Sequence, residues 1–169
     1  MLFSLLITCC TSCNSIKRGK VTGLIKGVAV KTIHDSIPIR MNVGVKIENR
    51  LNNNVILPIY DDLNPHFCSS IVASVNGKII KPRMLLAKRW SDSCTLKPNE
   101  SVNLILEIWD MDMLSIKGVD REDILTLLHQ IEFHYERCEY DKAIVGREIE
   151  DIEFEIDKNP EVSFTNRDD

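Results

Sequence analysis

Alternation between apolar and polar residues is the dominant pattern of this chain. It is clearest over residues 39–48, where polar or small residues separate five apolar ones: Ile39, Met41, Val43, Val45 and Ile47. Successive side chains of a strand point to opposite faces, so this period of two predicts a strand with one buried face. The same pattern predicts further strands of this kind over 102–109, 131–136 and 152–157.

Turn-forming residues divide the rest of the chain into short segments. Asn76-Gly77 lies between apolar runs at 70–75 and 78–81. Both residues accept the positive φ angles of a type I′ turn, so a β-hairpin is predicted there. Other turns are expected at 50–54 and 97–100, and other strands over 28–34, 55–60 and 84–90, the first of them at the edge of its sheet.

One short helix is predicted near residues 120–130. Asp120 is placed to cap it, and the acidic residues Glu122 and Asp123 favour the positive end of the helix dipole. Apolar residues then follow on one stripe at helical spacing: Ile124, Leu127, Leu128 and Ile131. A helix of this length suits a crossing between two sheets.

Seven to nine short strands with one helix predict an all-β fold, an antiparallel β-sandwich, with one domain over residues 28–157. In the spacing of its predicted strands and turns, this segment resembles immunoglobulin-like modules. Residues 13–27, which combine basic residues with three glycines, are expected to form a tether. The tail that contains Pro160, residues 158–169, is expected to be frayed.

The amino terminus has the composition of an export signal. An apolar run, Leu2 to Ile7, leads into small residues and three cysteines: Cys9, Cys10 and Cys13. These residues resemble the signal peptide of bacterial lipoproteins, in particular those of the Bacteroides group, where asparagine is a familiar residue after the modified cysteine.

The resemblance implies a location in the cell envelope. Residues 1–12 would be removed and Cys13 would be acylated, with Cys9 and Cys10 as alternative acylation sites. Several acyl chains hold a protein stably on a membrane. Asn14, in place of aspartate, implies the outer membrane, and the basic residues that follow it imply a domain that faces the periplasm.

The net charge of −4 conceals two halves of opposite sign. Residues 13–100 carry 14 Lys and Arg against 6 Asp and Glu, whereas residues 101–169 carry 7 against 19. We expect strands of the two halves to pair and neutralise each other. Nucleic-acid binding is disfavoured, because the total is acidic and aromatic residues are not interleaved with the basic ones.

The remaining cysteines are Cys68, Cys94 and Cys138. In an oxidising compartment a Cys68–Cys94 disulfide is the preferred pair, because both residues flank the predicted hairpin; three buried free thiols are the alternative. Cys138 follows His134 by four residues, which leaves a small hydrolase or thiol-redox enzyme as an alternative function. No metal site and no cofactor site is predicted.

Tryptophan beside basic residues is typical of interface hot spots and of sugar-stacking platforms. Trp109 falls out of register with the apolar face of its strand. Trp90 has more basic neighbours, and the predicted binding surface is the hairpin face around it, with Lys78, Arg83, Lys88, Arg89 and Trp90.

These features together predict a membrane-anchored envelope lipoprotein that acts as a non-catalytic binding module. Its partner would be an envelope protein or a glycan, and a carbohydrate-binding module is the second alternative beside the enzyme.

Overall fold

The computed structural model describes residues 19–33, 37–58, 71–86, 93–109, 120–136 and 149–166. Within these ranges lie ten strands and one helix: β1 (Val21–Ile33), β2 (Ile37–Asn49), β3 (Val55–Pro58), β4 (Ile71–Val75), β5 (Lys78–Ile80), β6 (Arg83–Leu86), β7 (Ser93–Leu96), β8 (Ser101–Ile108), α1 (Arg121–Gln130), β9 (Glu132–Tyr135) and β10 (Glu153–Asn166). The prediction of an all-β, sandwich-like fold with one short helix is confirmed. The ten described strands exceed the seven to nine expected.

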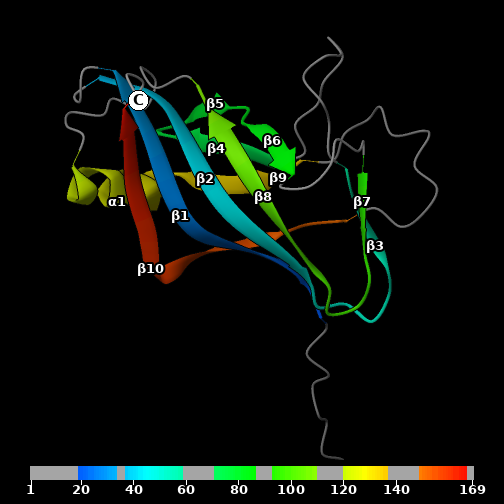
Figure 1. The fold of residues 1–169 in the computed structure, drawn as a ribbon. Helices are drawn as coiled ribbons and strands as arrows, with labels where there is room; N and C mark the ends of the chain where they lie inside the picture. Colours follow the sequence, from blue (N-terminus) through cyan, green and yellow to red (C-terminus); the bar gives the residue numbers. More distant parts are fainter. Residues whose placement is uncertain are drawn as a thin grey trace, which may run out of the picture.

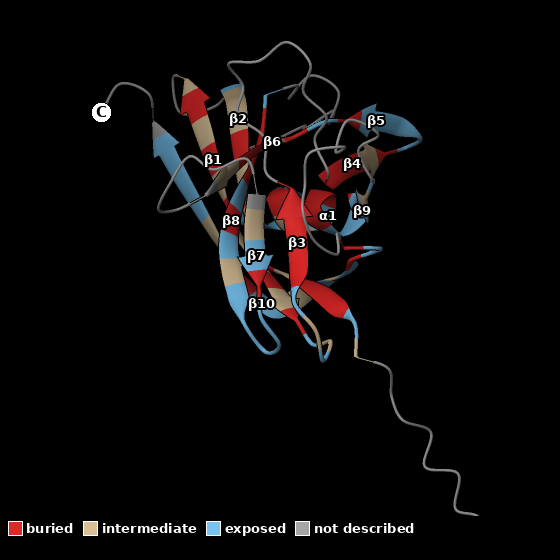
Figure 2. Cartoon of the chain, turned by 90° about the vertical axis from the view of Figure 1, so that its right-hand side faces the viewer, coloured by how far each residue is buried: buried red, intermediate tan, exposed pale blue. Residues whose placement is uncertain are grey.

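The strands form three sheets arranged in layers (Figure 1). The largest sheet has the order β10-β1-β2-β8-β6, and the two smaller sheets have the orders β5-β4-β9 and β3-β7. In Figure 2 the strands of the five-stranded sheet lie mainly on one side of the molecule, and α1 with β4 and β9 lies on the other; in Figure 1 α1 and β9 run behind the sheet. Buried residues of both layers belong to one core cluster.

The alternation in β2 builds the centre of this core. Met41, Val43, Val45 and Ile47 are at most 2% exposed. They lie opposite apolar residues of β8, for example Val43 opposite Leu106. From the other layer, Ile71 of β4 and Ile124 of α1 join the same cluster. The predicted apolar face of β2 is therefore confirmed.

Both ends of the predicted domain need correction. Residues 21–27 are not a tether but the first half of β1, which lies between β10 and β2 and is not an edge strand. Residues 158–166 are not frayed but continue β10, which pairs with β1 in parallel. This parallel pair also departs from the antiparallel sheet that we predicted.

The continuation of β10 past Pro160 has a local cause. Ile156 lies opposite Ile25, and Glu161 lies opposite Gly27, so residues 157–160 have no register partner in β1. Pro160 falls inside this bulge, where its missing N–H removes no ladder hydrogen bond. Gly27 permits the close approach of the strands beyond the bulge, since a Cβ atom there would lie 2.6 Å from the Glu161 carbonyl oxygen.

The predicted hairpin and helix are confirmed. Asn76 and Gly77 have φ angles of 50° and 76° and connect β4 to β5, as a type I′ turn requires. The Asp120 carboxylate accepts a 2.7 Å hydrogen bond from the Asp123 N–H and so caps α1. Ile124 and Leu128 are fully buried against the sheet.

The basic and acidic halves meet in the five-stranded sheet. Lys20 and Lys26 of the first half form ion pairs with Glu153 and Asp157 of β10. Glu107 of β8 also pairs with a basic residue of the first half, as described below. The prediction that strands of the two halves pair and neutralise each other is confirmed.

Candidate functional site

The five-stranded sheet has a second face that points away from the core, which we call the outer face. Residues that alternate with the buried ones occupy it, such as Arg40 and Asn42 on β2 and Ile105 and Glu107 on β8. Most side chains at these positions are polar. Ile105 is an apolar exception, and it is 36% exposed. Two features on this face stand out, a charged cluster and a hollow.

Glu107 is the centre of the charged cluster and is only 4% exposed. Its Oε1 atom lies 2.7 Å from Nη1 of Arg40, and its Oε2 atom lies 3.9 Å from Nη1 of Arg83. The Trp109 indole N–H donates a 2.9 Å hydrogen bond to Oε2. A buried carboxylate is stable only with such partners. We call Arg40, Arg83, Glu107 and Trp109 the Glu107 cluster.

Trp109 is the exposed member of this cluster. Its residue is 57% exposed, and the Arg40 guanidinium carbon lies 5.1 Å from the centroid of its ring system. This distance is within the range of a cation–π interaction. The hydrogen bond and the guanidinium together fix the orientation of the indole while much of its surface faces solvent. The prediction that Trp109 lies off the apolar face of its strand is confirmed.

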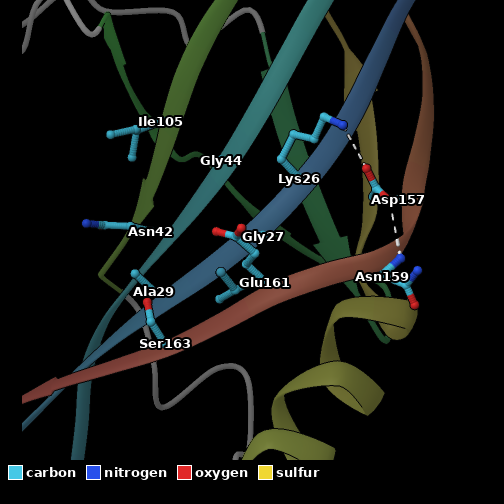
Figure 3. A pocket seen from close by; sticks show the side chains of 11 residues that line it. Lys26, Gly27, Ala29, Asn42, Gly44, Ile105, Asp157, Asn159, Glu161 and Ser163 are labelled. Atoms are coloured by element: carbon cyan, nitrogen blue, oxygen red, sulfur yellow. Dashed lines mark hydrogen bonds and ion pairs between the residues drawn. The ribbon is translucent and has the colours of Figure 1, made fainter.

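A hollow of about 440 Å³ lies beside the cluster on the same face (Figure 3). It is lined by Lys26, Gly27, Val28, Ala29, Asn42, Gly44, Ile105, Asp157, Asn159, Glu161 and Ser163. Gly27, Ala29 and Gly44 have little or no side chain, so the sheet is low at its centre. At Gly44 a Cβ atom would meet nothing nearer than the Gly27 carbonyl oxygen at 3.7 Å.

The wall formed by β10 is held by a short network. Lys26 Nζ lies 2.8 Å from Asp157 Oδ2, and the Asn159 N–H donates a 3.2 Å hydrogen bond to Asp157 Oδ1, as the dashed lines in Figure 3 show. The Lys26 hydrogen bond, followed by the backbone hydrogen bond, lowers the pKa of Asp157. The lowered pKa favours the charged form of the carboxylate.

Asn42 connects the hollow to the Glu107 cluster. It lines the hollow, and in the sheet register it lies opposite Ala29 on one side and opposite Glu107 on the other. Its Oδ1 atom is buried and has no hydrogen-bond partner among the described residues. An unpaired buried carbonyl oxygen is unfavourable. A ligand over the hollow could contact the partly exposed remainder of the Asn42 side chain, but not this buried oxygen.

Of the predicted binding residues, the structure describes only Lys78 and Arg83. Lys78 is exposed on β5 in the three-stranded sheet, whereas Arg83 belongs to the Glu107 cluster on the five-stranded sheet. Lys88, Arg89 and Trp90 lie outside the described residues. Lys78 and Arg83 therefore lie on different sheets, and Arg83 lies in the cluster that contains Trp109.

The cysteine predictions stay open. Cys94 on β7 is partly buried and forms no disulfide with another described residue, and burial, followed by the charge of Glu100, raises its pKa. Cys68, its predicted disulfide partner, lies outside the described residues, as do Cys9, Cys10, Cys13 and Cys138.

Among the described residues, the surroundings of His134 do not form a catalytic relay. Its Nε2 atom lies 3.4 Å from Ser74 Oγ and 3.6 Å from Glu132 Oε2. A relay needs the hydroxyl and the carboxylate on opposite nitrogens of the ring, so that one nitrogen accepts a proton while the other is held. Here both groups face the same nitrogen, and the side chain is exposed.

Sequence reasoning missed Arg40, Asn42, Glu107 and the hollow. The sequence did contain one signal: the polar residues that alternate with the apolar ones in β2 and β8 must share one face of each strand. The adjacency of β2, β8 and β6, which joins them into one site, is not visible in the local pattern.

No family model, no curated protein and no solved structure matches this chain. Within the described part of the chain, no helix has the length and apolar character needed to cross a membrane.

Proposed function

We propose that this chain is a non-catalytic binding module of an envelope lipoprotein, and that it binds through the outer face of its five-stranded sheet. The observation that carries this proposal is the fixed and exposed Trp109 indole, held by the buried carboxylate of Glu107 and by Arg40. Tryptophan and arginine are the residues that most often dominate binding energy at interfaces.

The fixed orientation of Trp109 favours a role in binding. A side chain that is already ordered loses little conformational freedom when a ligand docks on it, and this reduces the cost of association. The part of the Trp109 side chain that faces solvent also contributes no hydrophobic stabilisation to the folded monomer. A ligand that covers the Trp109 ring would explain why a buried ion pair holds this exposed side chain in place.

The membrane anchor rests on the amino-terminal residues. If Cys13 is acylated, eight residue steps separate it from the start of β1 at Val21. A fully extended chain of that length spans at most about 29 Å. The domain would therefore stay near the membrane surface, which limits its ligands to molecules of the envelope.

The anchor is tested by the intact mass of the native protein extracted from membranes. Cleavage before Cys13 with added acyl chains is the expected result, and Cys13→Ser should abolish the modification while Cys9→Ser and Cys10→Ser should not. An unprocessed chain of unmodified mass would contradict the proposal.

The binding face is tested by photocrosslinking in intact cells. A photoreactive benzoylphenylalanine replaces Ile105, which lines the hollow, or Ile79, which is 61% exposed on β5 in another sheet. Both variants change an exposed isoleucine of a strand, so they are matched. We expect specific adducts from position 105 that exceed those from position 79. Equal labelling from both positions would contradict the proposed face.

A further inference from the structure

We propose that the ligand of the outer face is an uncharged oligosaccharide, with one sugar stacked on Trp109 and the following sugars over the hollow. This inference rests on the proposed binding function and names its ligand class. It is carried by the juxtaposition of an exposed indole, a polar hollow with a low floor, and a balanced set of charges.

The available surface of Trp109 suits a sugar ring. The indole N–H is its single polar atom, and that atom already donates to Glu107. What remains for a ligand is aromatic carbon, and one flank of the ring system is approached by the Arg40 guanidinium. An apolar ring face of a pyranose can stack on such a surface while its hydroxyls stay free.

The hollow supplies groups that bind hydroxyls. Asn42, Asn159 and Ser163 each have both a donor and an acceptor in the side chain, and the Glu161 carboxylate adds acceptors. The Asn42 Oδ1 atom is buried, so Asn42 can offer a ligand only its amide N–H groups.

The charges of the surface argue against a strongly charged ligand. The cations of the cluster and of the hollow are Lys26, Arg40 and Arg83, and the anions are Glu107, Asp157 and Glu161. Lys31, opposite Arg40 in the register, adds one cation at the rim. A polyanion or a basic peptide would require a clear excess of one sign. A neutral polyhydroxyl ligand is compatible with paired charges of both signs.

The dimensions of the surface favour more than one sugar. Trp109 and Ile105 lie four residues apart along the same strand direction, which corresponds to about 13 Å. Beside Ile105, across β2 and β1, the floor of Gly27, Ala29 and Gly44 leaves room above the sheet for a second ring. A single sugar on Trp109 would leave the hollow unfilled.

The test is a glycan array probed with the full chain. The array carries neutral oligosaccharides of increasing length and, for each, a counterpart with uronic acids; a set of random peptides is probed in parallel. Three variants accompany the wild type: Trp109→Ala, Gly44→Leu, which fills the hollow, and Ile79→Ala as the control on another sheet. Circular dichroism establishes that each variant is folded.

We expect binding to neutral oligosaccharides, a decrease in affinity of at least tenfold for Trp109→Ala, and no change for Ile79→Ala. Gly44→Leu should weaken binding of the longer oligosaccharides while binding of the shortest one persists. Binding to the acidic counterparts or to peptides alone would overturn the inference, as would a wild type that binds no glycan. If photocrosslinking still gives adducts at position 105 in those cases, the proposed function stands and only the ligand class is wrong.

Discussion

Replacement of Glu107 by alanine should destabilise the fold far more than an ordinary surface substitution. The change leaves the guanidinium of Arg40 without its 2.7 Å carboxylate partner and the Trp109 N–H without its acceptor. Loss of one partner from a buried ion pair costs about 3–5 kcal/mol. The Arg40 and Arg83 side chains are 26% and 30% exposed, so water screens part of the charge. We therefore expect a decrease of about 2–3 kcal/mol in the free energy of unfolding.

Urea denaturation followed by circular dichroism measures this decrease, and thermal unfolding gives a second readout. In a chain of this size, 1 kcal/mol shifts the melting temperature by about 2–4 °C, so a decrease of about 4–12 °C is expected. Glu107→Gln keeps one acceptor oxygen for either Arg40 or Trp109, replaces the other oxygen by an NH2 donor and removes the charge. Because it retains this acceptor and the side-chain volume, it should cost less than the alanine variant.

A matched control is Glu48→Ala, which removes a carboxylate that pairs with the exposed Arg50 at 3.2 Å on the same sheet. Exposed pairs contribute less than about 1 kcal/mol. If Glu107→Ala destabilises the protein no more than Glu48→Ala does, the description of Glu107 as the buried centre of the cluster is wrong.

Three further predictions concern other parts of the structure. Gly27→Ala should destabilise the fold by about 1–3 kcal/mol, because its Cβ atom would lie 2.6 Å from the Glu161 carbonyl oxygen, whereas Gly44→Ala should be nearly neutral; equal urea midpoints for the two would contradict this. Because folding lowers the pKa of Asp157, this residue is protonated at a higher pH in the unfolded chain than in the folded one, so its charge stabilises the fold above about pH 4 and this stability is lost on acidification. The urea midpoint of Asp157→Asn should therefore fall less between about pH 5 and 2 than that of the wild type, and identical pH profiles would refute this. The raised pKa and partial burial of Cys94 predict slower alkylation at about pH 8 in the native protein than in urea, measured by mass spectrometry; equal rates would show an accessible thiol.

Local patterns predicted the elements whose signals are complete within one segment. The alternation of β2, the Asn76-Gly77 turn and the Asp120 cap each require only neighbouring residues, and all three are present. Pro160 was misleading, because a proline ends a regular strand but is tolerated inside a bulge. The bulge depends on the pairing of β10 with β1, which no local pattern reveals. For the same reason, no local pattern indicated that β10 and β1 pair in parallel.

The candidate site was only partly predictable for the same reason. The exposure of Trp109 follows from its position in the alternation, and Arg83 was selected for its basic neighbours. Their connection runs through Glu107, which the sequence presents as one polar residue among many. Arg40 and Arg83 reach it only because β2 and β6 flank β8 in the sheet. Sheet order is set by packing across the whole core, so the cluster could not be derived from spacing along the chain.

The central claim, that Trp109 serves binding rather than folding, is tested most directly by one paired measurement on Trp109→Ala. Binding of the full chain to isolated envelope and its melting temperature are determined on the same preparation. Trp109→Ala removes one hydrogen bond from the buried Glu107 carboxylate, so we expect a decrease of about 1–2 kcal/mol in stability, or about 2–8 °C in melting temperature, and binding weakened at least tenfold. Unchanged binding, or a loss of binding that accompanies a larger decrease in melting temperature, would contradict the account.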